Sequence, residues 1–109
     1  MIESAVSRAG MLCVLMSALS PPAMAEIPVE RQAGLRHMLK QDCGSCHGMT
    51  LKGGLGPALT VDSIAHKPRQ LLLTTILDGR KGTPMPPFRG MLSEEEATWL
   101  VDLLYQGDI

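Results

Sequence analysis

Residues 42–48 read DCGSCHG, and this segment constrains the chain more than any other. It places two cysteines three positions apart and a histidine directly after the second. Closely spaced thiols serve three chemistries: a redox disulfide, a metal site, or covalent attachment of haem. The rest of the chain has to discriminate among these three.

The first 25 residues are typical of a secretory signal peptide. A short start carrying Arg8 precedes an apolar run over residues 9–19, and a proline pair and the small-residue triplet AMA follow. This layout predicts cleavage after Ala25. The apolar run is too short to span a bilayer comfortably, and no later segment is long and apolar enough. We therefore expect a periplasmic domain, residues 26–109, without a membrane anchor. The alternative is an uncleaved N-terminus that is amphipathic or anchors the chain in a membrane.

The domain that remains after cleavage is small. A short chain buries only a modest apolar core, and exported domains of this size usually need disulfides, a metal or another staple. Cys43 and Cys46 are the only cysteines beyond the first 25 residues. A disulfide between them would close too small a loop to constrain the unfolded chain. The formal net charge of −1 also indicates no general attraction to nucleic acid.

Hydrophobic periodicity predicts three helices and no strand, so the expected fold class is all-α. The first helix covers residues 31–41. The second begins at Pro68 and ends at Gly79, and the third follows Ser93, which forms a capping box with Glu96. The two loops between these helices are long and rich in glycine and proline. A large ligand enclosed by the loops would explain both their length and the small core.

The motif C-x-x-C-H is the attachment signature of a c-type haem. Two thiols one helical turn apart can each form a thioether with a haem vinyl group, and the adjacent His47 then lies beside the iron as an axial ligand. Zinc would need about two further strong ligands, and only His37 and His66 are available. A thioredoxin-like redox site expects a βαβ setting, which the pattern lacks. We predict one haem c on Cys43 and Cys46, with the redox disulfide and zinc as alternatives.

Met85, in the segment GTPMPPF, is the predicted second axial ligand. Prolines restrict the backbone on both sides of it, and a thioether is a soft, neutral ligand that favours ferrous iron. Met49 is too close to His47 to cross the ring, Met91 lacks the rigid setting, and His66 is the alternative. With both axial positions filled, no site for a substrate remains at the iron. The sequence therefore predicts a one-electron carrier and not an enzyme.

These features resemble the small monohaem cytochromes c with His–Met ligation, over residues 31–106. The resemblance rests on CGSCH, on Gly56-Pro57, on GTPMPP and on the two terminal helices. In that family a proline carbonyl accepts the imidazole N–H of the first axial ligand, which implies this role for Pro57. Family members also cross their terminal helices closely at a glycine, which suggests Gly34.

The stretches QDCGSCHG, GGLGPALT and GTPMPPFRGMLSEEEA are similar to the small periplasmic cytochrome c that accompanies the haem c plus haem d nitrite reductase of denitrifying bacteria. That resemblance implies electron delivery to the reductase or a part in its maturation, including haem d assembly. We expect a monomer that meets redox partner proteins. The segment between histidine and methionine has no tryptophan to hydrogen-bond a haem propionate, so the sequence does not identify the propionate partners.

Charge is distributed unevenly along the chain. Residues 63–92 carry five basic side chains against one acid, whereas residues 93–109 carry five acids and no base. The basic segment includes Met85, near the place where a haem edge would emerge. An acidic patch on a partner could be steered to it, although ordinary solvated faces would give the same pattern.

Overall fold

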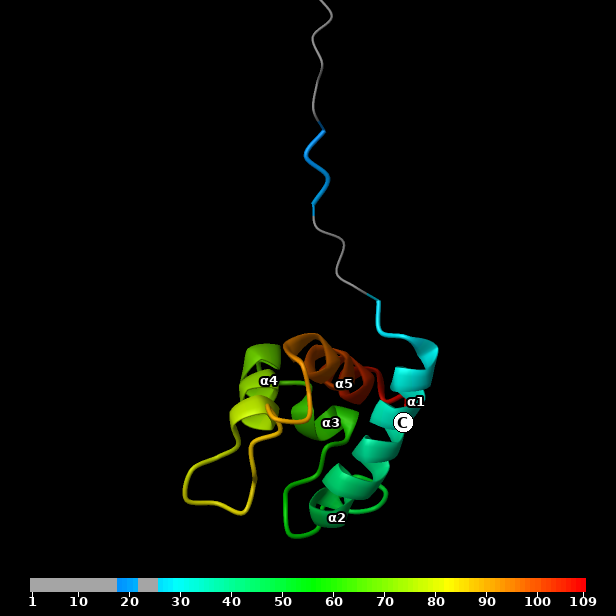
Figure 1. Cartoon of the computed structure of the whole chain (residues 1–109). Helices are drawn as coiled ribbons and strands as arrows, with labels where there is room; N and C mark the ends of the chain where they lie inside the picture. The colour runs from blue at the N-terminus through cyan, green and yellow to red at the C-terminus, as the bar shows by residue number, and fades with distance from the viewer. Residues whose placement is uncertain (1–17, 22–25) are drawn as a thin grey trace, which may run out of the picture.

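Helices account for all the regular structure that the computed structural model assigns to residues 18–21 and 26–109. Their order is α1 (Val29–Met38), the π-helical segment η1 (Leu39–Cys43), α2 (Gly44–His47), α3 (Val61–Ile64), α4 (Arg69–Asp78) and α5 (Glu94–Gln106) (Figure 1). No strand occurs in this part of the chain, so the all-α prediction is confirmed. Apart from residues 18–21, the predicted signal peptide lies outside the described residues, and it stays a prediction. No helix in the described ranges is both long and apolar enough to cross a bilayer.

The first three elements form one helical run from Val29 to His47, because the residues that join them keep right-handed helical backbone angles. The run is longer than the predicted helix over residues 31–41, because the chain stays helical through the cysteine motif. Its π-helical turns end at Cys43, the first thiol of the motif. A π-helical turn changes the direction in which the following side chains leave the helix, and such turns are frequent at functional sites.

The second and third predicted helices are confirmed. Pro68 caps α4 with extended backbone, and Gly79 ends it with φ +68°. At α5 the Ser93 side chain accepts from the Glu96 N–H, and the Glu96 carboxylate accepts from the Ser93 N–H, which completes the capping box. The sequence did not predict α3, because four residues are too few to show a helical period.

The core is apolar and includes residues from every helix except α2. No polar or charged residue among those described is buried. The buried cluster consists of Leu35, Leu39, Leu51, Ile64, Leu72, Leu77, Phe88, Leu92, Ala97, Leu100, Val101 and Leu104. Several of its members, including Leu39, Leu72 and Leu100, also line a cavity on one side of the cluster. The helices therefore pack on each other and leave an apolar wall for a bound group.

The terminal helices α1 and α5 meet without a close contact at Gly34. This glycine is exposed, and a Cβ built on it would meet only the Arg31 side chain, at 3.9 Å. The role suggested for Gly34 is therefore wrong. Leu35, which is fully buried, is the residue of α1 that enters the core. The Arg36 guanidinium of α1 lies 5.5 Å from the centre of the Trp99 ring in α5, within reach of a cation–π contact.

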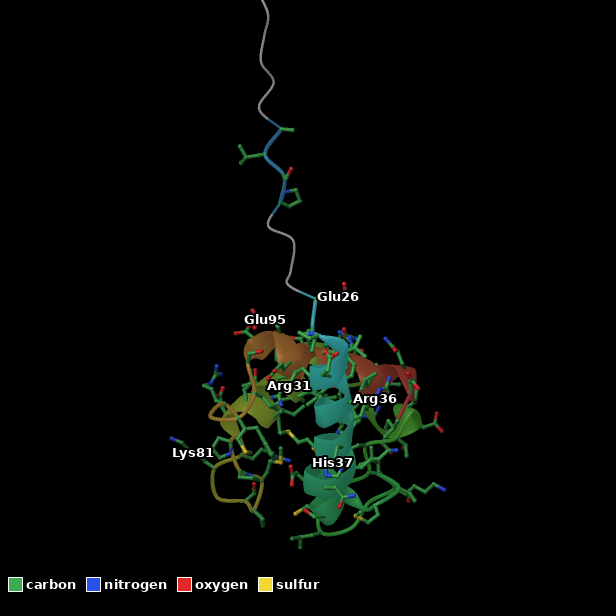
Figure 2. The ribbon with its side chains drawn as sticks, turned by 45° about the vertical axis from the view of Figure 1, so that its right-hand side comes forward. Glu26, Arg31, Arg36, His37, Lys81 and Glu95 are labelled. Atoms are coloured by element: carbon green, nitrogen blue, oxygen red, sulfur yellow. The ribbon has the colours of Figure 1, made fainter. Side chains whose placement is uncertain are left out.

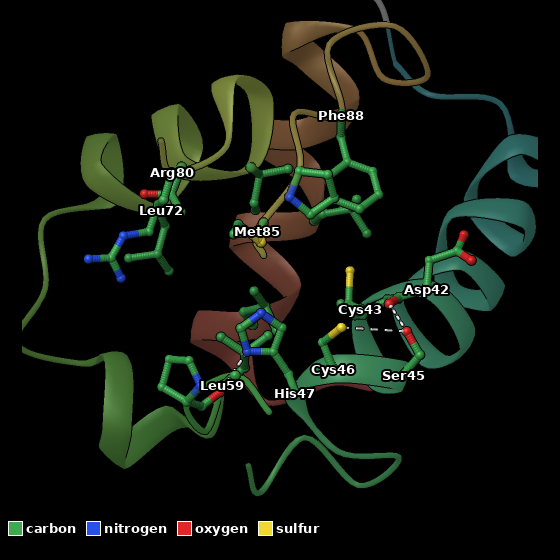
Figure 3. Close-up of a pocket in the computed structure, with 18 of the residues that line it drawn as sticks. Asp42, Cys43, Ser45, Cys46, His47, Leu59, Leu72, Arg80, Met85 and Phe88 are labelled. Atoms are coloured by element: carbon green, nitrogen blue, oxygen red, sulfur yellow. Dashed lines mark hydrogen bonds between the residues drawn. The ribbon is translucent and has the colours of Figure 1, made fainter. Parts of the chain in front are cut away.

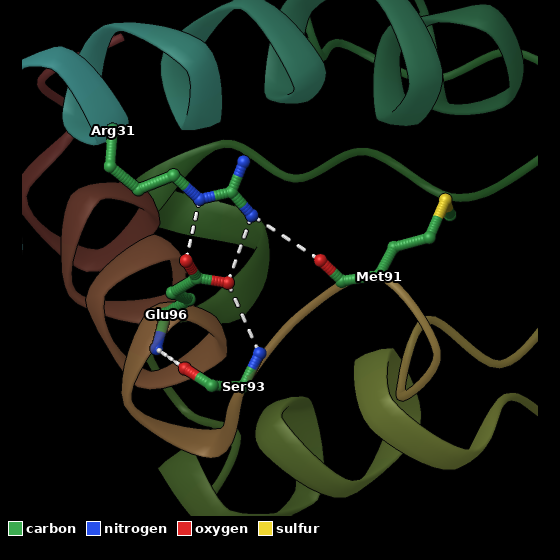
Figure 4. A network of polar contacts seen from close by, with 4 residues as sticks. All are labelled: Arg31, Met91, Ser93 and Glu96. Carbon is green, nitrogen blue, oxygen red and sulfur yellow. Dashed lines mark hydrogen bonds and ion pairs between the residues drawn. The ribbon is translucent and has the colours of Figure 1, made fainter.

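A polar cluster holds the start of α5 against α1 (Figure 4). The Arg31 guanidinium donates from Nε and Nη2 to the two carboxylate oxygens of Glu96 at 2.5 and 2.9 Å, and Nη2 also donates to the Met91 carbonyl at 3.3 Å. The hydrogen bonds from Arg31 hold the pKa of Glu96 below its usual range. Since Glu96 also completes the capping box with Ser93, one carboxylate joins two helices and ends the loop before α5.

Candidate haem site

An apolar cavity of about 730 Å³ lies between η1, α2, α4 and the loops that flank them (Figure 3). The residues predicted to hold a haem come from three separate segments of the sequence, and all of them line this cavity: Cys43, Cys46, His47, Pro57 and Met85. The tertiary structure therefore brings together two thiols, an imidazole, a carbonyl and a thioether.

The two thiols lie on one side of the cavity, near the end of the helical run from Val29 to His47. They are not joined in a disulfide. Burial, followed by the neighbouring Asp42 carboxylate, raises the pKa of the Cys43 thiol to about 11. A redox dithiol needs a thiolate of lowered pKa as its nucleophile, so this environment does not suit the redox alternative. The described residues also contain no group of three side chains among His, Cys, Asp and Glu that could hold a metal ion, so the zinc alternative gains no support.

The His47 ring is oriented by a hydrogen bond to the loop that follows it. His47 Nδ1 lies 2.6 Å from the Pro57 carbonyl oxygen. Because a carbonyl only accepts, Nδ1 carries the proton, and Nε2 is left as the free ligand atom. The loop also covers the end of α2, since Gly53 N–H and Gly56 N–H donate to the carbonyls of His47 and Cys46, both at 2.8 Å.

Gly56 is a site residue whose role the sequence did not reveal. A Cβ built on it would lie 2.8 Å from His47 Cε1, 2.9 Å from Nδ1 and 3.3 Å from Cγ. Only a glycine lets the loop pass this close to the ring face. The resemblance to small cytochromes c includes the Gly-Pro pair, but the contact with His47 depends on how the loop folds back, which no local pattern encodes.

Met85 lies in a loop that is held by hydrogen bonds within the loop and by a bond back to α4. The Arg80 N–H donates to the Met85 carbonyl at 3.1 Å, and the Met85 N–H donates to Thr83 Oγ1 at 3.3 Å. After the prolines, the Phe88 N–H donates to the Ile76 carbonyl at 3.0 Å. In Figure 3 the Met85 sulfur lies on the His47 side of the loop, above the ring. Hydrogen bonds thus add to the restriction that the prolines impose.

Gly79 allows this loop to return against α4. A Cβ there would lie 2.8 Å from the Met85 carbonyl oxygen, and the residue has φ +68°. Any side chain at this position would push the Met85 backbone away from the helix end. Gly79 therefore ends α4 and also positions the candidate ligand.

The alternative ligands are placed less favourably. His37 and His66 are exposed and do not line the cavity. Met49 is 61% exposed and is not part of the wall. Met91 lines the cavity but is 56% exposed. Of the candidates for the second axial position, Met85, Met49, Met91 and His66, only Met85 both lines the cavity and is partly buried.

The donor set fits haem c. Two thiols next to an oriented imidazole can form the two thioethers and one axial bond, and the apolar wall suits the porphyrin faces. An all-helical fold that encloses such a site defines a c-type cytochrome. Comparison with known proteins agrees: the family described as "Cytochrome C oxidase, cbb3-type, subunit III" matches residues 30–104. The chain belongs to this family of c-type cytochrome domains and carries covalently attached haem c.

Two curated relatives are both called "Cytochrome c55X". The protein from Pseudomonas aeruginosa is 62% identical over 79 residues, which cover 72% of this chain and 66% of the relative. The protein from Stutzerimonas stutzeri is 51% identical over 104 residues, which cover 94% of this chain and 91% of the relative.

The fold is likewise similar to a solved structure, the "c-type cytochrome NirC". The two share 57% sequence identity with a TM-score of 0.74, and the match covers 75% of this chain and 96% of NirC. The chain is therefore a monohaem c-type cytochrome related to cytochrome c55X and NirC, and the resemblance drawn from its motifs is confirmed.

Proposed function

We propose that this chain is a periplasmic, monomeric one-electron carrier that donates electrons to a nitrite reductase. In this proposal Cys43 and Cys46 hold the haem covalently, and His47 and Met85 are the axial ligands. The nitrite reductase follows from the resemblance of the motifs quoted above, and export follows from the N-terminal pattern.

The observation that carries the proposal is that an imidazole and a thioether line one cavity and lie across it from each other in Figure 3. When bound there, haem c supplies a one-electron redox couple. The Pro57 carbonyl keeps His47 in the tautomer that a ligand needs. Met85, as a soft neutral donor, favours the reduced state. A site with two protein ligands offers no position to a substrate, which supports electron transfer over catalysis.

The charges support docking on the face that carries the Met85 loop. Of the five basic residues in 63–92, Arg69 pairs with Asp102, and Arg89 pairs with Asp78 at 2.8 Å. Lys81 forms no ion pair within the described residues, and its side chain points outwards from the loop that carries Met85 (Figure 2). The free positive charge is therefore concentrated near the cavity, where an acidic partner surface could be steered to it.

The test is stopped-flow oxidation of the reduced cytochrome by nitrite reductase that contains all its cofactors. Oxidation should be fast and should slow as salt rises, because ions screen exposed charges. Lys81→Glu should slow it several-fold, whereas Lys52→Glu makes the same charge change on an exposed residue outside the cavity wall and should have little effect.

Negligible oxidation would overturn the carrier proposal for this partner. If cells lacking the chain then accumulate reductase without its second haem, the protein serves in maturation of the reductase. If those cells instead contain complete reductase, the partner is a different redox protein. Sedimentation of the purified cytochrome tests the monomer.

A further inference from the structure

Three charged side chains line the cavity: Asp42, Lys67 and Arg80. Asp42 lies at the end of the cavity that holds the thiols, beside Ser45 (Figure 3). Arg80 lies on the opposite side in the same view, and the two candidate axial ligands lie between it and the thiols. The cavity therefore has an end with thiols and an end with a guanidinium.

Arg80 has a fixed backbone and a free side chain. Its N–H donates to the Met85 carbonyl at 3.1 Å, and its carbonyl accepts from Thr83 Oγ1 at 2.7 Å. Its guanidinium forms no ion pair or hydrogen bond with any of the described residues. The nearest acid in the sequence, Asp78, is already bound to Arg89 at 2.8 Å. A cation on an ordered backbone at a cavity wall, without an acidic partner, is suited to bind an anionic group of the ligand.

The chemistry of haem identifies that group. The macrocycle carries its vinyl groups on one half and its two propionates on the other. If the vinyls are joined to Cys43 and Cys46, the carboxylates lie at the end of the cavity opposite the thiols. We propose that the Arg80 guanidinium binds a haem propionate, a role for which the sequence offered no tryptophan. The proposal rests on the haem site and does not depend on the electron acceptor.

The guanidinium is expected to act on the redox equilibrium in two ways. A positive charge near the ring disfavours the ferric state, which carries one more positive charge, and so raises the reduction potential. It also keeps the propionate ionised to lower pH. The other titratable groups that line the cavity are Asp42 and Cys43 at the far end, Cys46 and His47 in the attachment motif, and Lys67 before α4. Among these, Lys67 is the only other cation that could compete for a propionate.

The experiment measures the reduction potential of the haem-loaded protein as a function of pH, by electrochemistry, for four variants. Arg80→Gln should lower the ratio of reduced to oxidised protein at a fixed potential by about threefold to tenfold, where tenfold is about 59 mV for one electron. The rise of the potential on acidification, as the propionate is protonated, should begin about one pH unit higher. Lys81→Gln removes the neighbouring charge outside the cavity wall and should change both quantities much less. Arg80→Lys keeps the positive charge but loses the bidentate guanidinium contact. Its potential should stay close to that of the wild type, whereas its pH dependence should shift in the same direction as that of Arg80→Gln, by a smaller amount.

Absorption spectra before each titration establish that the thioethers and the methionine ligand are intact. Equal small effects of Arg80→Gln and Lys81→Gln would overturn the proposal, and so would a larger effect of Lys67→Gln than of Arg80→Gln. If Arg80→Gln loses methionine ligation, the comparison of Arg80→Lys with the wild type decides. A shift in the pH dependence of the reduction potential supports a specific guanidinium contact. An unchanged spectrum together with the wild-type pH dependence refutes it.

Discussion

Replacing Gly56 with alanine should displace the His47 ring. The added Cβ would lie 2.8 Å from the nearest ring atom, whereas ordinary contacts begin near 3.4 Å, so the ring or the loop must retreat by about 0.6 Å. A retreat of that size lengthens the 2.6 Å hydrogen bond from Nδ1 to the Pro57 carbonyl. Overpacking of this kind costs about 1–3 kcal/mol. For a domain of this size, the midpoint of thermal unfolding should fall by roughly 5–20 °C.

The assay is thermal unfolding of the oxidised, haem-loaded protein, followed by circular dichroism and by the haem absorption band. Gly90→Ala is the matched control, because a Cβ at Gly90 meets nothing within 4 Å and the residue does not have positive φ. The reasoning is refuted if the two variants unfold at the same temperature with the same spectrum. A drop confined to Gly56→Ala, with a perturbed haem spectrum, assigns the effect to the contact with His47.

Three further changes test the site and its support. Met85→Ala should remove the weak sulfur-to-iron absorption band of the oxidised protein and lower the reduction potential, because a thioether favours ferrous iron. The control variant Met49→Ala should retain the band. If both variants retain it, Met85 is not the axial ligand. Glu96→Gln should lower the melting temperature by several degrees at pH 7. The hydrogen bonds from Arg31 hold the pKa of Glu96 below 4.5, so the stabilisation by the ionised carboxylate is present above this pH and is lost as pH falls. The difference in melting temperature between Glu96→Gln and the wild type should therefore shrink at acidic pH. An equal difference at pH 7 and pH 3 would refute the ion-pair explanation. Changing both Cys43 and Cys46 to alanine should give a protein of low helicity without a cooperative melt by circular dichroism, because the ligand binds only the folded chain; a cooperative melt would show that the core is sufficient.

Much of the helical structure could be predicted because its signals are local. Pro68 and Gly79 bound α4, and the Ser93 capping box begins α5, where backbone angles and neighbouring side chains decide the outcome. The long helix was predicted too short, since the motif CGSCHG has neither an apolar stripe nor a helix-forming composition. It stays helical through Gly44 because the chain beyond it folds back and satisfies the end of the helix.

The sequence by itself determined the attachment chemistry, because two thiols and a histidine in one helical turn are defined by their spacing alone. It also singled out Met85, because its prolines are its neighbours. Only the tertiary structure decided the contact of Gly56 with the His47 ring, the place of Arg80 opposite the thiols in the cavity, and the exposure of Gly34. These depend on how the loops fold back onto the helices. Such long-range contacts are set by packing and loop closure, which leave no periodic signal in the residues that make them.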